Sequence, residues 1–170
     1  EDAVKQLFSF IESEVGVVQS VVHCAAPNPV PQAFDDLQWD VFQKYLDTQL
    51  KGAFNCVKRA LPHMIQAKSG AIVFLGSVFA EGIPPVQQSA YVVTKSALAT
   101  LARSLAVEYG PKGVRVNVVS PGMTHTEMIS NIPEKVKMLA KMNTPLRRLA
   151  EPDEVASVIQ FLLSPESKHI

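Results

Sequence analysis

The sequence predicts a doubly wound α/β fold, with a parallel sheet held between two layers of helices. Three short runs are apolar almost throughout and rich in β-branched residues, namely 17–24, 71–76 and 114–119. Strands that are buried on both faces have this continuous apolar character, whereas half-exposed strands alternate. Helical patterns separate the three runs, and this order is typical of a parallel sheet in three α/β/α layers.

The first two helices are predicted from periodicity and from their end signals. Residues 2–14 carry apolar side chains at helical spacing, and Gly16 follows as a stop. Residues 25–35 contain three prolines, which exclude regular structure there. A long helix is expected over about 37–66, and Pro62 predicts a kink or a broken last turn inside it.

The remaining helices follow the second and third strands. Residues 89–109 place apolar side chains at four-residue intervals, and Gly110 with the proline after it ends that helix. Short helical pieces are expected within 125–142. The segment 151–154 has a proline at its second position and acidic residues around it, which predicts the start of a last helix reaching about residue 163.

Composition excludes several classes of protein. The 170 residues hold 16 basic and 16 acidic side chains, and 47% are hydrophobic, which suits one domain with a sizeable core. Zero net charge gives no support for a nucleic-acid or membrane-surface binder. No apolar run approaches the roughly 18 residues of a membrane span. Cys24 and Cys56 form neither a Cys-x-x-Cys pair nor a zinc spacing, so we expect no metal and a reduced, cytoplasmic protein.

Candidate chemistry lies where ligands bind in such folds, beyond the carboxyl ends of the strands. Ser77 follows the second strand, and Tyr91 and Lys95 lie one turn apart near the start of the next helix. An ammonium group beside a phenol lowers its usual pKa of about 10, which makes the pair a usable general acid and base. The alternatives are a turn-capping hydroxyl at Ser77 and an ordinary surface Tyr–Lys pair.

Four blocks of sequence resemble the short-chain dehydrogenase/reductase family in order and spacing, and together they cover nearly all of the chain. They read LKGAFNCVKRALPHM (50–64), GAIVFLGSVFAEG (70–82), YVVTKSALATLARSLAVEYGPKGVRVNVVSPGMTHTEM (91–128) and PLRRLAEPDEVASVIQFLLSPES (145–167). The resemblance implies a Rossmann-like sheet. It also implies that Tyr91 donates the proton to a carbonyl and contacts the cofactor, that Lys95 lowers the pKa of Tyr91 and binds the nicotinamide ribose, and that Ser77 orients the substrate.

The same resemblance implies where a cofactor, NAD or NADP, would be held. A loop after the third strand is expected to hold the nicotinamide carboxamide through four residues: Pro121, Gly122, Thr124 and Thr126. Residues 125–145 match a mobile substrate lid. Arg147 and Arg148 are expected to be solvated surface charges rather than ligands for a phosphate.

The chain departs from the family pattern in two segments. The family's Asn-Asn-Ala-Gly reads His23-Cys24-Ala25-Ala26 here, a segment whose last three residues we expect to contact the cofactor through the backbone. The Cys24 thiol is expected to be a buried, small apolar group. Gln49 stands where the family has a catalytic Asn that holds a water in the proton relay. Its longer side chain leaves two readings open, a relay residue and a plain helix-facing glutamine.

The resemblance places residues 1–170 in the C-terminal two-thirds of one domain. The Gly-rich turn that binds pyrophosphate has no counterpart in the sequence, and we expect a segment of a longer chain. The expected function is hydride transfer between nicotinamide and a small carbonyl or secondary alcohol, in the manner of 3-oxoacyl reductases, by a homotetramer or dimer. The alternatives are a non-catalytic binding or assembly module, an inactive fragment, and an epimerase or dehydratase that uses the same Tyr–Lys pair.

Overall fold

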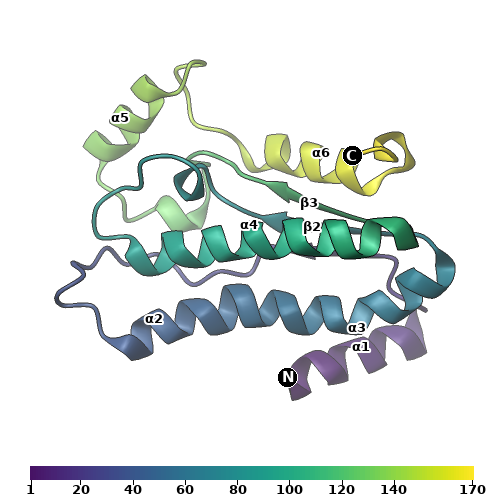
Figure 1. Ribbon diagram of the computed structural model, residues 1–170. Coiled ribbons are helices and arrows are strands. Elements are labelled where there is room, and N and C mark those ends of the chain that lie inside the picture. The colour runs from purple at the N-terminus through teal and green to yellow at the C-terminus, as the bar shows by residue number, and fades with distance from the viewer.

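The computed structural model describes residues 1–170 and contains one parallel sheet with the strand order β1-β2-β3. These strands are β1 (Ser20–His23), β2 (Gly70–Leu75) and β3 (Val114–Val119). Val73 in the central strand pairs with Val22 on one side and with Asn117 on the other. Helices cover both faces of the sheet (Figure 1), so the predicted three-layer α/β/α class is confirmed.

The main core lies between the sheet and two long helices, α3 (Gly52–Ala67) and α4 (Ser89–Tyr109). Ile72 and Phe74 of β2 are completely buried and point into this layer. Helix α1 (Asp2–Glu14) packs against α3, and α6 (Pro152–Leu163) covers the opposite face of the sheet (Figure 1). No helix is both long and apolar enough to span a bilayer.

The predicted bounds hold for α1 and α4 but not for the first strand. We expected that strand over 17–24, whereas β1 begins at Ser20 and ends at His23. The reason is pairing, because strand pairing with β2 begins at Ser20 opposite Ala71. Val17 is 53% exposed and contributes an apolar side chain without strand structure.

The long helix expected over 37–66 consists of three parts. They are α2 (Trp39–Tyr45), a π-helical segment (Leu46–Lys51) and α3. The expected broken last turn at Pro62 is wrong, since α3 continues through it to Ala67 and ends where Lys68 adopts a left-handed φ of 50°. The irregularity falls instead at the π-helical segment, and such wide turns inside α-helices occur frequently at functional sites.

Beyond β3 the chain leaves the body of the domain and then returns. The helical pieces expected within 125–142 are a 3₁₀ turn (Glu127–Ile129) and α5 (Glu134–Asn143), which projects away from the sheet (Figure 1). Helix α6 begins as predicted, because Glu151 and Glu154 form a reciprocal capping box there.

The turn into β3 depends on a glycine, which generates a first prediction. Gly113 has a φ of +85°, and a Cβ there would lie 2.2 Å from the carbonyl oxygen of Lys68. Both the backbone conformation and this contact oppose a side chain. We expect Gly113→Ala to lower the free energy of unfolding by about 3 kcal/mol, measured by urea denaturation.

Gly110 supplies the matched control three residues earlier. Its φ is −54°, and a Cβ there would meet nothing within 4 Å. Gly110→Ala should therefore change the stability by less than about 0.5 kcal/mol. Equal losses in the two variants would show that the conformation of Gly113 is not what matters.

Candidate active site

The carboxyl ends of the three strands meet at one edge of the sheet, as predicted. The Gly76 N–H donates to the Val119 carbonyl at 2.7 Å, and the Val78 N–H donates to the Pro121 carbonyl at 3.2 Å. A Cβ on Gly76 would lie 2.6 Å from Ser120 Oγ, so only glycine allows these two loops to approach so closely. The segments after β2 and β3 therefore form one continuous surface.

Ser77 is buried at this edge and has two neighbours of interest. Its Oγ accepts a hydrogen bond from the Phe79 N–H at 3.3 Å and so caps a 3₁₀ turn (Val78–Ala80). The same hydroxyl interacts with the Tyr91 phenol, where it favours the ionised form. The capping role that we considered as an alternative is thus present together with a position beside Tyr91.

Lys95 is not a surface lysine. Its residue is 3% exposed, and Nζ donates to the carbonyl oxygen of Leu75, the last residue of β2, at 2.6 Å. Burial lowers the pKa of this ammonium group from 10.5 to about 8. Nζ also lies 5.7 Å from the centre of the Tyr91 ring, so the predicted pairing of the two side chains on one face of α4 is observed.

The expected effect of Lys95 on Tyr91 is absent in this structure. Burial raises the pKa of Tyr91, the Ser77 hydroxyl opposes that change, and the nearby Tyr45 adds to it. Lys95 is not among the groups that lower this pKa, and its ammonium group donates to the Leu75 carbonyl. Tyr91 is therefore protonated at neutral pH, the state that a proton donor to a carbonyl requires.

Tyr45 is a member of this site that the sequence analysis missed. Its hydroxyl accepts from the Val30 N–H at 3.2 Å and donates to the Asn28 carbonyl at 3.4 Å, which holds the proline-rich loop against the end of α2. The signal that would have found it is spacing, since Tyr45 precedes Gln49 by four residues and lies on the same helix face.

Gln49 and His23 are buried polar residues near these side chains. Gln49 is 0% exposed within the π-helical segment, and neither its Nε2 nor its Oε1 has a hydrogen-bond partner. His23 is 7% exposed, and its Nε2 is also unpaired. Such unsatisfied atoms are costly and rare, so this pair needs an explanation. No three His, Cys, Asp or Glu side chains gather as a metal site.

The segment after β1 departs from one expectation. Cys24 is exposed, so the prediction of a buried apolar thiol is wrong. Within these residues β1 ends at His23, and the chain beyond it has no strand partner. Ala25 and Ala26 follow in the same irregular segment, at the edge where the resemblance places the cofactor.

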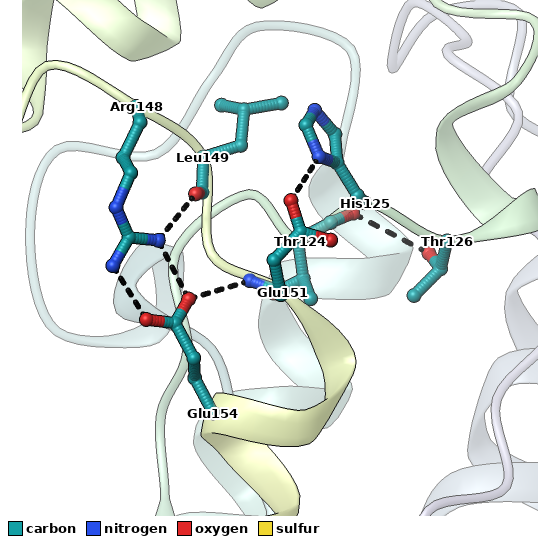
Figure 2. A network of polar contacts seen from close by, with 7 residues as sticks. All are labelled: Thr124, His125, Thr126, Arg148, Leu149, Glu151 and Glu154. Atoms are coloured by element: carbon teal, nitrogen blue, oxygen red, sulfur yellow. Dashed lines mark hydrogen bonds and ion pairs between the residues drawn. The ribbon is translucent and has the colours of Figure 1, made fainter.

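The loop after β3 is anchored to the start of α6 (Figure 2). Thr124 forms an isolated parallel bridge with Ala150, and the His125 N–H donates to the Ala150 carbonyl at 2.9 Å. His125 Nδ1 and Glu151 Oε1 lie 2.6 Å apart. The chain just before and at the start of the expected lid, residues 125–145, is thus joined to the segment that precedes α6.

A second ion pair reinforces the same junction. Arg148 donates through both terminal nitrogens to the Glu154 carboxylate, with one bond at 2.6 Å (Figure 2). This pairing lowers the pKa of Glu154 to about 2. Arg148 is therefore a paired surface charge, close to what the sequence analysis expected.

The loop residues expected at the nicotinamide follow β3 at the same edge of the sheet. Thr124 Oγ1 donates to the Gly122 carbonyl at 3.1 Å, and Thr126 Oγ1 donates to the Thr124 carbonyl at 3.5 Å. The Pro121 carbonyl accepts a hydrogen bond from the Val78 N–H, which follows β2. A cavity of about 350 Å³ lies between the 3₁₀ turn Glu127–Ile129 and α5. Ser77, Tyr91 and Lys95 do not line it.

Comparisons with known proteins agree with this arrangement. A family model described as enoyl-(acyl carrier protein) reductase matches residues 1–170. Oxidoreductase UcpA of Escherichia coli K12 is 38% identical over 146 residues, covering 81% of this chain and 56% of UcpA. The chain thus spans about half the length of that relative.

Two solved structures are similar over nearly the whole chain. A 3-oxoacyl-[acyl-carrier protein] reductase with bound NAD from Brucella melitensis is 32% identical with a TM-score of 0.87, covering 98% of this chain and 63% of that one. A protein described as a short chain dehydrogenase/reductase family protein is also 32% identical, with a TM-score of 0.86, covering 99% of this chain and 67% of that one.

The buried charge of Lys95 generates a prediction about stability. Because the folded pKa is about 8 and the ordinary value is 10.5, the unfolded chain binds more protons between these pH values. The buried charge therefore opposes folding below pH 8, and this opposition fades as the pH rises toward 10.5. We expect Lys95→Met to raise the free energy of unfolding at pH 7 by about 1–3 kcal/mol.

The pH dependence distinguishes this effect from a general gain in packing. The difference between Lys95→Met and the parent should shrink as the pH rises from 8 to above 10, measured by chemical denaturation at each pH. Lys44 is an exposed lysine, and Lys44→Met should show no such trend. A constant difference at all pH values would contradict a buried charge at Lys95.

Proposed function

The chain belongs to the short-chain dehydrogenase/reductase family, and on this basis we propose that the whole protein is an NAD(P)-dependent oxidoreductase acting on a carbonyl or secondary alcohol. The observation that carries the proposal is the convergence of Ser77, Tyr91 and Lys95 at the strand edge, with Lys95 buried against the end of β2. In an ordinary surface Tyr–Lys pair the ammonium group would remain in water, because burial of a charge is unfavourable.

The residues at this edge fit the nicotinamide end of a dinucleotide. Lys95 uses one N–H for Leu75, and its other two are free to donate to a ribose hydroxyl. Gly122 has open space where a side chain would project, so a ligand can approach the loop backbone there. In this proposal Pro121, Thr124 and Thr126 face the carboxamide, and the 24–26 segment contacts the cofactor through its backbone.

Each catalytic side chain then has a defined task. The bound nicotinamide supplies or accepts the hydride. Tyr91 gives its phenolic proton to the carbonyl oxygen during reduction and takes it back during oxidation. Ser77 holds that oxygen in line with the phenol through its hydroxyl. Lys95, with a pKa of about 8, is protonated at neutral pH and can return a proton toward Tyr91.

Gln49 extends this set of residues toward the interior. Its amide is buried with both polar atoms unpaired, which favours the relay reading over that of a plain helix-facing glutamine. A buried amide that can both donate and accept is suited to hold a relay water near Lys95. We assign it the place that the family gives to asparagine.

The substrate in this proposal is a small carbonyl compound of the 3-oxoacyl class. Support comes from the similarity to the Brucella 3-oxoacyl-[acyl-carrier protein] reductase. Residues 125–145, clamped at their base through Thr124 and His125, would close over it. The 170 residues would then form the C-terminal two-thirds of a single domain whose remainder binds the rest of the cofactor, NAD or NADP.

The proposal includes a cytoplasmic homo-oligomer, a tetramer or a dimer. Two free cysteines suit a reducing compartment. Phe54 on α3 and Val93 on α4 are each about half exposed, so the outer faces of these two helices offer apolar surface to a second copy. Light scattering of the whole protein should give a mass of two or four protomers, and a monomer would contradict this part of the proposal.

Replacement of one tyrosine tests the function itself. Tyr91→Phe removes the proton that the substrate oxygen needs while keeping the ring. We expect kcat for a responsive ketone to fall by about 10²- to 10⁴-fold in the whole protein. Binding of the nicotinamide cofactor, followed by fluorescence titration, should remain within about threefold, since Lys95 and the loop are unchanged.

Tyr109 at the other end of α4 provides the control. It lies outside the strand edge, so Tyr109→Phe should retain the parent kcat. Unchanged turnover in Tyr91→Phe would contradict the proposed function and would favour a binding or assembly module. Turnover without net oxidation or reduction of nicotinamide would instead favour an epimerase or dehydratase.

A further inference from the structure

The cavity between the 3₁₀ turn Glu127–Ile129 and α5 is polar and lies almost entirely outside the proposed catalytic site. Its volume of about 350 Å³ is at the lower end of the range for ligand pockets. Ile129 is its one apolar lining residue, and the other seven are polar or charged. Only Thr126 is shared with the residues that we propose for the cofactor. The cavity therefore offers room and polar groups for a small molecule of its own.

Two lysines of α5 line this cavity. Lys137 and Lys141 are separated by one helical turn, so they lie on the same face of the helix. The Lys137 side chain is only 16% exposed, which packs its stem into the wall, and its Nζ donates to Glu134 Oε1 at 2.8 Å. The ammonium group of Lys141 has no ion-pair or hydrogen-bond partner in the chain, so all three of its N–H groups are free to donate.

A carboxylate of the chain itself lies beside these two lysines. Glu134 is the first residue of α5, and its side chain is 82% exposed, in contrast to the enclosed Lys137. The hydrogen bond from Lys137 holds the pKa of Glu134 below its usual value, and the charges of Lys141 and His125 act in the same direction. The surroundings thus favour an oxyanion. Because exposed ion pairs contribute little, Glu134 can turn into solvent at small cost.

The charges around the cavity indicate the class of ligand. With Glu134 in place, the two lysines are balanced by two carboxylates, those of Glu134 and Glu127. When Glu134 turns outward, one positive charge is left without a partner, since His125 is engaged by Glu151 at 2.6 Å. A ligand with a single negative charge restores the balance, whereas a dianion would leave the cavity negative.

Ser130 adds a neutral donor to the same cavity. It follows the 3₁₀ turn, and its hydroxyl forms no hydrogen bond within the chain. A carboxylate has two oxygen atoms and accepts several hydrogen bonds, which are strongest from charged donors. The free N–H groups of Lys141 and the hydroxyl of Ser130 therefore supply the kind of donors that a bound carboxylate requires.

We propose that this cavity is a binding site for a small monocarboxylate, whose carboxylate group is held by Lys137 and Lys141. Ser130 donates to the same group, and Glu134 is the side chain that the ligand displaces. The site itself does not depend on the proposed function. Two sources present the same chemistry, namely a carboxylate group on the substrate and a separate carboxylic acid, and the experiments below distinguish them.

Methionine methyl signals in the NMR spectrum of the whole protein report on the cavity. Met138 and Met142 each follow one of the two lysines on α5, whereas Met64 is buried in the core. The probe is butyrate, compared at equal ionic strength with neutral butyramide. We expect butyrate to shift the signals of Met138 and Met142 with a saturating, millimolar Kd and to leave Met64 unchanged. The absence of a saturating shift, or an equal response to butyramide, would overturn the proposal.

Substitutions of the lining charges should change the affinity for butyrate in opposite directions. Lys141→Met removes a charged donor, so we expect the Kd to rise by about fivefold or more. Glu134→Gln removes the competing charge and keeps the length of the side chain, so the Kd should fall by about two- to fivefold.

Lys135 provides the matched control on the same helix. It is exposed and does not line the cavity, so Lys135→Met should leave the Kd for butyrate unchanged. Equal losses in Lys135→Met and Lys141→Met would indicate general attraction to a basic helix and would contradict a defined site. Weaker binding in Glu134→Gln would show that Glu134 is not the displaced group.

The source of the carboxylate is decided by kinetics of the whole protein, an experiment that rests on the proposed function. The substrates are a keto acid and a neutral ketone of equal length. If the carboxylate belongs to the substrate, Lys141→Met should raise KM for the keto acid by about fivefold and leave kcat and the neutral ketone within about twofold. If both substrates behave as in the parent while butyrate binding is lost, the site takes a separate carboxylic acid.

The site and the proposed function fail in distinguishable ways. Butyrate binding is measured without turnover, so it does not require an active enzyme. Full activity in Tyr91→Phe would contradict the oxidoreductase and leave the butyrate titration unchanged. Loss of the methionine shifts, with the expected low activity of Tyr91→Phe, would instead remove the carboxylate site and retain the oxidoreductase.

Discussion

The hydrogen bond from the Lys95 ammonium group to the Leu75 carbonyl is the interaction on which the site depends. It ties α4 to the end of the central strand and brings the first turns of the helix over the edge where three strands end. A charge in this position opposes folding, as its lowered pKa indicates. The apolar layer formed by β2, α3 and α4 offsets that cost. Proteins commonly give up stability in this way at functional sites.

The same edge requires that two loops come into close contact. Gly76 permits the backbone after β2 to touch the backbone after β3, and Ser77 follows at once in an extended conformation. Ser77 then has a fixed direction because its hydroxyl also caps a turn. In the proposed function, the proton donor Tyr91 and the substrate-orienting Ser77 are thus placed by rigid elements, whereas the proposed lid projects from the body of the domain. This division suits a site that must hold its chemistry fixed while admitting different substrates.

The π-helical segment connects the sheet to the chemistry from the interior side. A regular α-helix over 37–66 would place Gln49 at a different angle, and an extra residue in one turn changes that direction. The histidine at the end of β1 and the glycine after the turn are the features that accommodate this irregularity.

The sequence by itself determined the class of the fold, the ends of α1 and α4, and which chemical groups lie at the candidate site. Continuous apolar runs, helical periodicity and the spacing of Tyr91 and Lys95 are local properties, and local patterns survive in the folded chain. The tertiary structure decided the rest. The first strand is short because its pairing with β2 begins only at Ser20. Helix α3 continues through Pro62 without a break. Burial raises the pKa of Tyr91, and His23 packs beside the π-helical segment. Both effects depend on what packs around a side chain, and residues far apart in the chain supply that packing.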